Sequence, residues 1–169
     1  MTGPWAGTAA FVALGGNVGD RRAHLDGAVE DLRATEGVEV AGVSRWIETA
    51  PVGGPVGQRP FLNGAVELHT RLAPAVLLER LQAIEARHGR DRSREVPDGP
   101  RTLDLDLLLH GDARSATEAL TLPHPRLEER LFVLEPLSEL APDLPLPGSG
   151  LTVRARIAEL TGSAAGAAL

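Results

Sequence analysis

Two aspartates in the segment RTLDLDLLLH, residues 101–110, have the spacing that most directly suggests chemistry. Side chains at positions i and i+2 of a β-strand share a face, so Asp104 and Asp106 would lie about 7 Å apart along the backbone. Two neighbouring carboxylates repel each other, and each is costly to bury alone. Divalent cations remove both costs, and Mg²⁺ is the usual ion where phosphate oxygens complete the octahedron. The alternative is a strand with one solvated face, which is common in antiparallel sheets.

The stretch just before this strand is rich in arginine and is interrupted by glycine and proline. Its arginines are Arg87, Arg90, Arg92, Arg94 and Arg101. Beside two carboxylates, a mobile arginine loop suits polyphosphate chemistry, in which metal ions and guanidinium groups stabilise the charge that develops during transfer. The alternative is a solvated charged loop with no role in binding.

The composition excludes several kinds of site. The chain has 169 residues, which is the size of one domain, and a net charge of −6, which argues against a general nucleic-acid binder. Cysteine, lysine and tyrosine are absent from the printed sequence. Disulfides, thiolate nucleophiles and a P-loop lysine are therefore excluded, and phosphate must be bound by arginines, backbone amides or metal. Three phenylalanines and two tryptophans are too few for a stacking surface that reads RNA.

We expect no signal peptide at the N-terminus. The first residues, MTGPWAGTAAFVALGGN, lack a basic segment, and no apolar run reaches the roughly 18 to 20 residues needed to span a bilayer. We expect a cytoplasmic protein with no membrane and no nucleic-acid partner. One domain should cover residues 8–161, with flexible termini at 1–7 and 162–169 because these ends are small and polar or proline-broken.

Hydrophobic periodicity predicts alternating strands and helices. Strands are expected at 8–14, 38–47, 61–68 and 102–110, helices at 20–36 (capped by Asp20) and 74–88, and long loops at 49–60 and 89–101. A short helix near Glu128 and a final helix at 153–160 should follow. This order is the βαββαβ pattern of a ferredoxin-like α+β sandwich with a C-terminal extension. Loops of a dozen residues in so short a chain are typically functional.

Several segments together resemble one enzyme family. They are GPRTLDLDLLLH, LTLPHPRLEERLFVLEPL, VALGGNVGDRRAHL, ETAPVGG and FLNGAVEL. This ordered set resembles the 6-hydroxymethyl-dihydropterin pyrophosphokinases of folate biosynthesis, from about residue 11 to residue 160. The resemblance implies transfer of the β,γ-pyrophosphoryl group of ATP to the hydroxymethyl oxygen of the pterin, with release of AMP.

The resemblance also implies roles for individual residues. Asp104 and Asp106 would bind two Mg²⁺ ions that bridge the ATP phosphates, and they would form the catalytic set with Arg90 and Arg101. Expected ATP-binding residues are Glu85, Arg92, Arg101, His124 and Arg130. Expected pterin-binding residues are Thr49, Val52, Phe61, Asn63 and Phe132, with the two phenylalanines sandwiching the ring. From the residues alone, a purely structural place in the core is the better prediction for both phenylalanines.

The sequence departs from the family pattern at three positions. Asp98 stands where a tryptophan is common, Pro125 and Phe61 where tyrosine is common. A different class of function is also compatible with the fold, because ferredoxin-like domains include regulatory ligand-binding and RNA-binding modules. Two aspartates facing an arginine-rich loop favour the enzyme, which we expect to act as a monomer.

Overall fold

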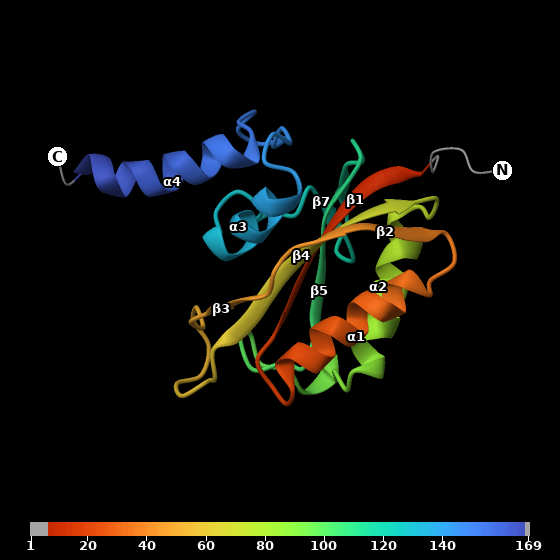
Figure 1. The fold of residues 1–169 in the computed structure, drawn as a ribbon. Helices are drawn as coiled ribbons and strands as arrows, with labels where there is room; N and C mark the ends of the chain where they lie inside the picture. The colour runs from red at the N-terminus through yellow and green to blue at the C-terminus, as the bar shows by residue number, and fades with distance from the viewer. Residues whose placement is uncertain (1–6, 168–169) are drawn as a thin grey trace.

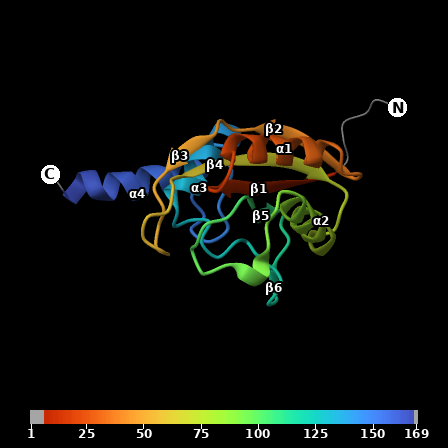
Figure 2. The same ribbon diagram turned by 90° about the horizontal axis from the view of Figure 1, so that it is seen from below.

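An antiparallel sheet in the order β2-β4-β1-β5 forms the centre of the molecule (Figure 1). The computed structural model describes residues 7–167. The long strands are β1 (Thr8–Gly16), β2 (Val38–Val43), β4 (Phe61–Thr70) and β5 (Asp104–His110). Figure 2 shows them side by side, with β5 at one edge of the sheet. Helix α1 (Arg21–Arg33) connects β1 to β2 and α2 (Pro74–Arg87) connects β4 to β5, so the predicted ferredoxin-like βαββαβ order is confirmed.

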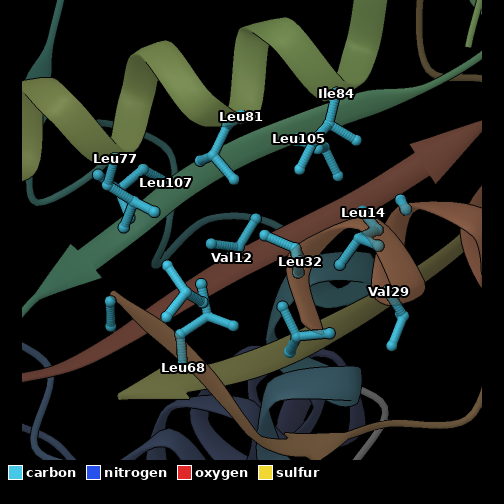
Figure 3. Close-up of a cluster of buried hydrophobic side chains, with 14 of the residues drawn as sticks. Val12, Leu14, Val29, Leu32, Leu68, Leu77, Leu81, Ile84, Leu105 and Leu107 are labelled. Carbon is cyan, nitrogen blue, oxygen red and sulfur yellow. The ribbon is translucent and has the colours of Figure 1, made fainter. Parts of the chain in front are cut away.

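The first two helices cover one face of the sheet. The side chain of Asp20 accepts a hydrogen bond from the backbone N–H of Ala23 and begins α1, as the sequence predicts. Pro74 occupies the start of α2, where its missing N–H costs nothing. The apolar stripes of both helices and the inward side chains of β1, β4 and β5 form the main core (Figure 3), with members that include Val12, Leu14, Leu25, Leu32, Leu68, Leu77, Leu81, Ile84, Leu105 and Leu107.

The other face carries the C-terminal part of the chain. Helices α3 (Leu131–Leu140) and α4 (Val153–Ala167) pack there around a second core that includes Phe11, Leu108 and Leu134. The sheet therefore lies between two helical layers, and the far part of α4 extends away from it (Figure 1). None of the helices between residues 7 and 167 is long and apolar enough to cross a membrane.

One prediction about the C-terminal part was wrong, and the flexibility of the C-terminal tail stays a prediction. No helix forms at Glu128, because its carboxylate caps the backbone N–H groups of Gly148 and Ser149 and its carbonyl accepts from Arg156 Nε at 2.8 Å. Helix α4 continues to Ala167, so the expected flexible tail at 162–169 is helical as far as residue 167. Residues 1–6 and 168–169, also expected to be flexible, lie outside the described residues.

The strand expected at 38–47 is interrupted. The Ser44 side chain accepts from the backbone N–H of Ala65 at 2.9 Å, while the Ser44 N–H donates to the Ala65 carbonyl. A side chain thus takes the place of a backbone acceptor, and pairing with β4 resumes only in β3 (Ile47–Thr49). The remaining short elements are the 3₁₀ helix Arg92–Arg94 and the hairpin of β6 (Ser115–Ala116) with β7 (Thr121–Leu122).

Candidate active site

A cavity of about 470 Å³ lies on the face of the sheet that α3 partly covers. The sequence-predicted residues that line it are Thr49, Val52, Phe61, Asn63, Arg101, Asp104, Asp106, His124, Arg130 and Phe132. Glu85, Arg90 and Arg92 are not among its lining residues. Segments that are far apart in the sequence therefore contribute to one cavity of a size suited to small molecules.

The floor of the cavity is a row of small residues between polar ones. Asp104 on β5 pairs with Gly15 on β1, which in turn pairs with Asn63 on β4; Ala13 lies opposite Asp106. Neighbouring strands are about 4.8 Å apart, so Asp104 and Asn63 are separated by about 10 Å. A Cβ atom at Gly15 would lie only 2.8 Å from Asn63 Oδ1. The glycine thus keeps the space between the acidic pair and the amide open.

The two aspartates differ in their surroundings. Asp104 accepts from Arg90 Nη1 at 2.8 Å and from Arg101 Nη1 at 3.2 Å. Asp106 accepts no hydrogen bond from the part of the chain described here. Its burial, together with the negative charges of Asp104 and Glu85, raises the pKa of Asp106 to about 7. Asp104 is therefore neutralised by arginines, whereas the Asp106 carboxylate lacks such a partner among the described residues.

This acidic pair fits a cation that arrives with phosphate. Among residues 7–167 there is no group of three or more histidine, cysteine, aspartate or glutamate side chains placed to hold a metal ion. Asp104 and Asp106 could thus supply only part of a coordination shell. Mg²⁺ is commonly held in this way, by one or two carboxylates with phosphate oxygens and water completing the octahedron.

Behind Asp104 lies a buried charge cluster. The Arg90 side chain is 4% exposed and donates to Glu95, Glu85 and Asp104. Burial opposes the charge of Arg90, but the hydrogen bonds that Arg90 donates to Glu95 and the charges of Asp104 and Glu85 outweigh it and raise the arginine pKa. Arg92 is half exposed and donates to Glu85 at 2.7 Å. The expected phosphate contacts of Arg90 and Arg92 remain predictions, since neither residue lines the cavity.

His124 is held as a neutral hydrogen-bond donor. Its backbone N–H donates to the Leu108 carbonyl, and its Nδ1 accepts from the backbone N–H of Arg126 at 3.2 Å. Burial and the charge of Arg130 lower the pKa of His124. The neutral ring then carries its proton on Nε2, which can donate to a phosphate oxygen. The Arg130 guanidinium lies 5.4 Å from the centre of the Phe132 ring.

The other end of the cavity combines an amide, a hydroxyl and two rings. Asn63 Nδ2 donates to Thr49 Oγ1, and Thr49 pairs with Phe61 across β3 and β4. Phe61 and Phe132 both line the cavity and are partly exposed. Exposure toward a cavity favours ligand contact over a purely structural role for these two rings. Val52 is 71% exposed on the loop above them.

One polar residue that sequence reasoning missed connects the two long loops. Asn17 is 1% exposed, and its Nδ2 donates to Gln58 Oε1 at 3.1 Å and to the Arg59 carbonyl at 3.0 Å. Its Oδ1 accepts from the backbone N–H of Arg101, also at 3.0 Å. Gln58 in turn donates to the carbonyl of Asp98 at 2.9 Å. The only local signal was an amide directly after a glycine pair, which is also typical of a simple turn.

Because the aspartates differ in pairing, removing their charges should have opposite effects on stability. Asp106→Asn should raise the free energy of unfolding of the metal-free protein at pH 8 by at least about 1 kcal/mol, or about 2–4 °C in Tm. A folded-state pKa raised to about 7 means that stability falls as pH rises from the unfolded value to that point. The gain should therefore shrink toward pH 4. Thermal unfolding with a chelator present, at pH 4 to 8, measures it.

Asp104→Asn is the matched variant, and it should lower Tm. It removes the negative charge that pairs with the buried guanidinium of Arg90 and with Arg101, together with one of the two acceptor oxygens. If both variants shift Tm in the same direction at pH 8, the predicted difference between the surroundings of Asp104 and Asp106 is wrong.

A ferredoxin-like sheet that carries an acidic pair and arginines in one cavity is the arrangement expected of a metal-assisted phosphotransferase. Comparison with known families places the chain within one. The model of the 7,8-dihydro-6-hydroxymethylpterin-pyrophosphokinase family matches residues 11–142, and the chain belongs to this family.

Several relatives carry the same name, 2-amino-4-hydroxy-6-hydroxymethyldihydropteridine pyrophosphokinase. The one from Bacillus subtilis is 51% identical over 131 residues, which is 78% of this chain and 77% of the relative. The one from Methylorubrum extorquens is 46% identical over 153 residues, 90% of this chain and 94% of the relative. The one from Synechocystis sp. is 44% identical over 144 residues, 85% and 72% of the two chains.

Solved structures agree on the fold. The crystal structure of an HPPK-DHPS in complex with substrates matches with a TM-score of 0.72 at 12% identity, covering 93% of this chain. Plasmodium falciparum HPPK-DHPS A437G with pteroate gives a TM-score of 0.71, also at 12% identity, covering 95%. This chain spans 44% of each of those chains.

Proposed function

We infer that this chain transfers the pyrophosphoryl group of ATP to the hydroxymethyl group of 6-hydroxymethyl-7,8-dihydropterin. The products are the pterin diphosphate and AMP, as in folate biosynthesis. One observation carries the inference: a single cavity holds the acidic pair at one end and the amide, hydroxyl and ring group at the other, separated by Gly15. The relatives named as pyrophosphokinases support the same activity.

The pterin would occupy the end formed by β3 and β4. Asn63 and Thr49 offer an amide and a hydroxyl for the polar edge of a pterin, and they would fix its orientation. Phe61 and Phe132 would stack on its faces, at about 0.5 to 1.5 kcal/mol per ring beyond simple burial. Val52 would add an apolar contact from the loop. The hydroxymethyl group would then point over Gly15 toward the aspartates.

ATP would lie between the aspartates and the segment that leads into α3. Arg101, His124 Nε2 and Arg130 can each donate to phosphate oxygens from the cavity wall. Two Mg²⁺ ions held by Asp104 and Asp106 would offset phosphate charge when bound. The half-exposed Arg92 would approach the nucleotide from the loop.

The reaction then needs little covalent help from the protein. The hydroxymethyl oxygen of the pterin forms a bond to the β-phosphorus of ATP, the bond from that phosphorus to the α,β-bridging oxygen breaks, and AMP leaves with that oxygen. The proton of the hydroxymethyl group goes to solvent. The chain contributes by holding both substrates in line and by stabilising the charge on the phosphates with arginines.

Calorimetry separates this enzyme from a regulatory ligand-binding or RNA-binding module. A non-hydrolysable ATP analogue should bind only when Mg²⁺ is present, because the acidic pair otherwise repels the phosphates. Binding that is equal with and without Mg²⁺ would favour a regulatory module, and tight binding of single-stranded RNA would favour the RNA reader.

Nucleotide should bind first and pterin second. The loops at 50–60 and 89–101 are held mainly by polar contacts such as those of Asn17 and Gln58, so few buried apolar contacts oppose their conformational entropy. ATP with Mg²⁺ gives Arg101 a phosphate partner and should order these loops. We expect the ATP analogue to raise pterin affinity by about 5- to 150-fold. Titration of the pterin in the presence and in the absence of the analogue measures this gain. Equal pterin affinities in the two titrations would exclude this order.

We also propose that the enzyme acts as a cytoplasmic monomer. The acidic pair and the group of amide, hydroxyl and rings come together in one cavity within a single chain, which supports this proposal. Size-exclusion chromatography with light scattering should give a mass near 17.8 kDa. A stable dimer at assay concentrations would contradict the monomer.

A further inference from the structure

Glu85 is a buried carboxylate that does not reach the cavity. It lies in the last turns of α2, is 1% exposed and is absent from the residues that line the site. A charged group at such a position is costly unless it is fully hydrogen-bonded. The sequence-based prediction of a direct ATP contact therefore does not account for its position.

The contacts of Glu85 converge on the strand that carries the aspartates. Glu85 Oε2 accepts from the backbone N–H of Leu105 at 2.8 Å, and Leu105 is the residue between Asp104 and Asp106. Because β5 is at the edge of the sheet with β1 on one side only, its outward N–H groups have no strand partner within residues 7–167. Glu85 thus supplies, from the helix, the acceptor that a neighbouring strand would supply elsewhere in the sheet.

A second set of bonds reaches the Asp104 side chain. The same carboxylate pairs with Arg90 Nη1, and Arg90 Nη1 also donates to Asp104 Oδ1 at 2.8 Å. The Arg90 side chain is 4% exposed and is further fixed by Glu95, so it has little freedom to move. Glu85 therefore holds both the backbone between the aspartates and, through Arg90, the Asp104 carboxylate.

Resting on the proposed function, we propose that Glu85 is a positioning residue, which sets the geometry of Asp104 and Asp106 for cation binding without touching the nucleotide. Outer partners that orient metal ligands usually change metal affinity by about 10- to 100-fold when removed. Loss of Glu85 should therefore raise the cation requirement of the protein and leave its intrinsic affinity for the nucleotide nearly unchanged.

Two variants and one control separate the roles of Glu85. Glu85→Gln keeps an oxygen that can accept from Leu105 but loses the ion pairs with Arg90 and Arg92. Glu85→Ala loses both. Glu79→Gln makes the same charge change at an exposed position of the same helix and is the control. Thermal unfolding of each protein confirms that it is folded at the assay temperature.

The first measurement is amide hydrogen exchange at Leu105, followed by NMR in the metal-free protein. Exchange should become at least about 10-fold faster in Glu85→Ala, because a hydrogen bond to a charged acceptor is lost. It should stay closer to wild type in Glu85→Gln, and Glu79→Gln should match wild type. Unchanged exchange in Glu85→Ala would show that Glu85 does not hold the strand, and the proposal would be wrong.

The second measurement is calorimetric titration of the non-hydrolysable ATP analogue at increasing Mg²⁺ concentration. The Mg²⁺ concentration for half-maximal binding should rise by about 10-fold or more in both Glu85 variants, while affinity at saturating Mg²⁺ stays within about 2-fold. The reverse pattern, weak nucleotide binding at saturating Mg²⁺ with an unchanged Mg²⁺ requirement, would assign Glu85 to the nucleotide and overturn the proposal. Wild-type protein that binds the analogue without Mg²⁺ would instead contradict the proposed function itself.

Discussion

Replacing either aspartate of the pair by alanine should lower kcat/KM by more than about 100-fold at saturating Mg²⁺, because each variant removes a carboxylate that would hold the cation against the phosphates. The structure gives this expectation a geometric basis. Asp104 and Asp106 lie on one face of β5, within the cavity and opposite small residues of β1. The initial rate of AMP formation, measured with both substrates present, checks the expected loss.

Asp143→Ala is the matched control, since Asp143 is an exposed aspartate outside the cavity that pairs only loosely with Arg154 at 3.5 Å. Its activity should equal that of wild type. Circular dichroism on all three variants confirms the fold. If Asp104→Ala or Asp106→Ala keeps more than about a tenth of the wild-type rate, the pair is not the cation site.

Arg101→Ala should lower kcat by about 30- to 1,000-fold and weaken nucleotide binding much less. Arg101 lines the cavity, and it donates one hydrogen bond to Asp104, with a distance of 3.2 Å from Nη1 to Oδ2. A cation bound to the Asp104 carboxylate would compete with this hydrogen bond, and the Arg101 guanidinium would then be free to bind phosphate oxygens. An interaction that forms mainly in the transition state affects kcat more than ground-state binding.

Steady-state kinetics and calorimetry on the same preparations measure the two effects of Arg101→Ala. Arg22→Ala, at a 75% exposed position on α1, controls for the loss of positive charge. A large loss of nucleotide affinity with unchanged kcat would make Arg101 a binding anchor and not a transition-state group.

The fold was largely predictable because its elements have clear local signals. The alternation of leucine and aspartate in the segment 103–107 predicted that Asp104 and Asp106 share a face, and both line the cavity, whereas Leu103, Leu105 and Leu107 lie in the core shared with α1 and α2. The break after Val43 was not predictable, because it depends on Ser44 meeting Ala65, a contact between distant segments. The segment around Glu128 was misassigned for the same reason, since its partners Gly148 and Ser149 lie some twenty residues away.

The candidate site was likewise predictable only in part. Residue types and the family resemblance predicted the residues that line the cavity, because short motifs encode them. The buried connections escaped prediction. The sequence around Asn17 contains no signal for its hydrogen bonds to two loops. The helical pattern around Glu85 likewise contains no signal for the hydrogen bond that it accepts from the Leu105 N–H. Such roles depend on which distant backbone groups are left without partners in the folded chain.

The identity of the products tests the central claim most directly. Purified protein, ATP, Mg²⁺ and 6-hydroxymethyl-7,8-dihydropterin should be incubated together and followed by ³¹P NMR. Transfer of a pyrophosphoryl group predicts equal amounts of AMP and of a pterin product with two mutually coupled phosphorus signals, and neither should form without pterin. Formation of ADP with a pterin monophosphate, or release of AMP that does not depend on pterin, would contradict the account.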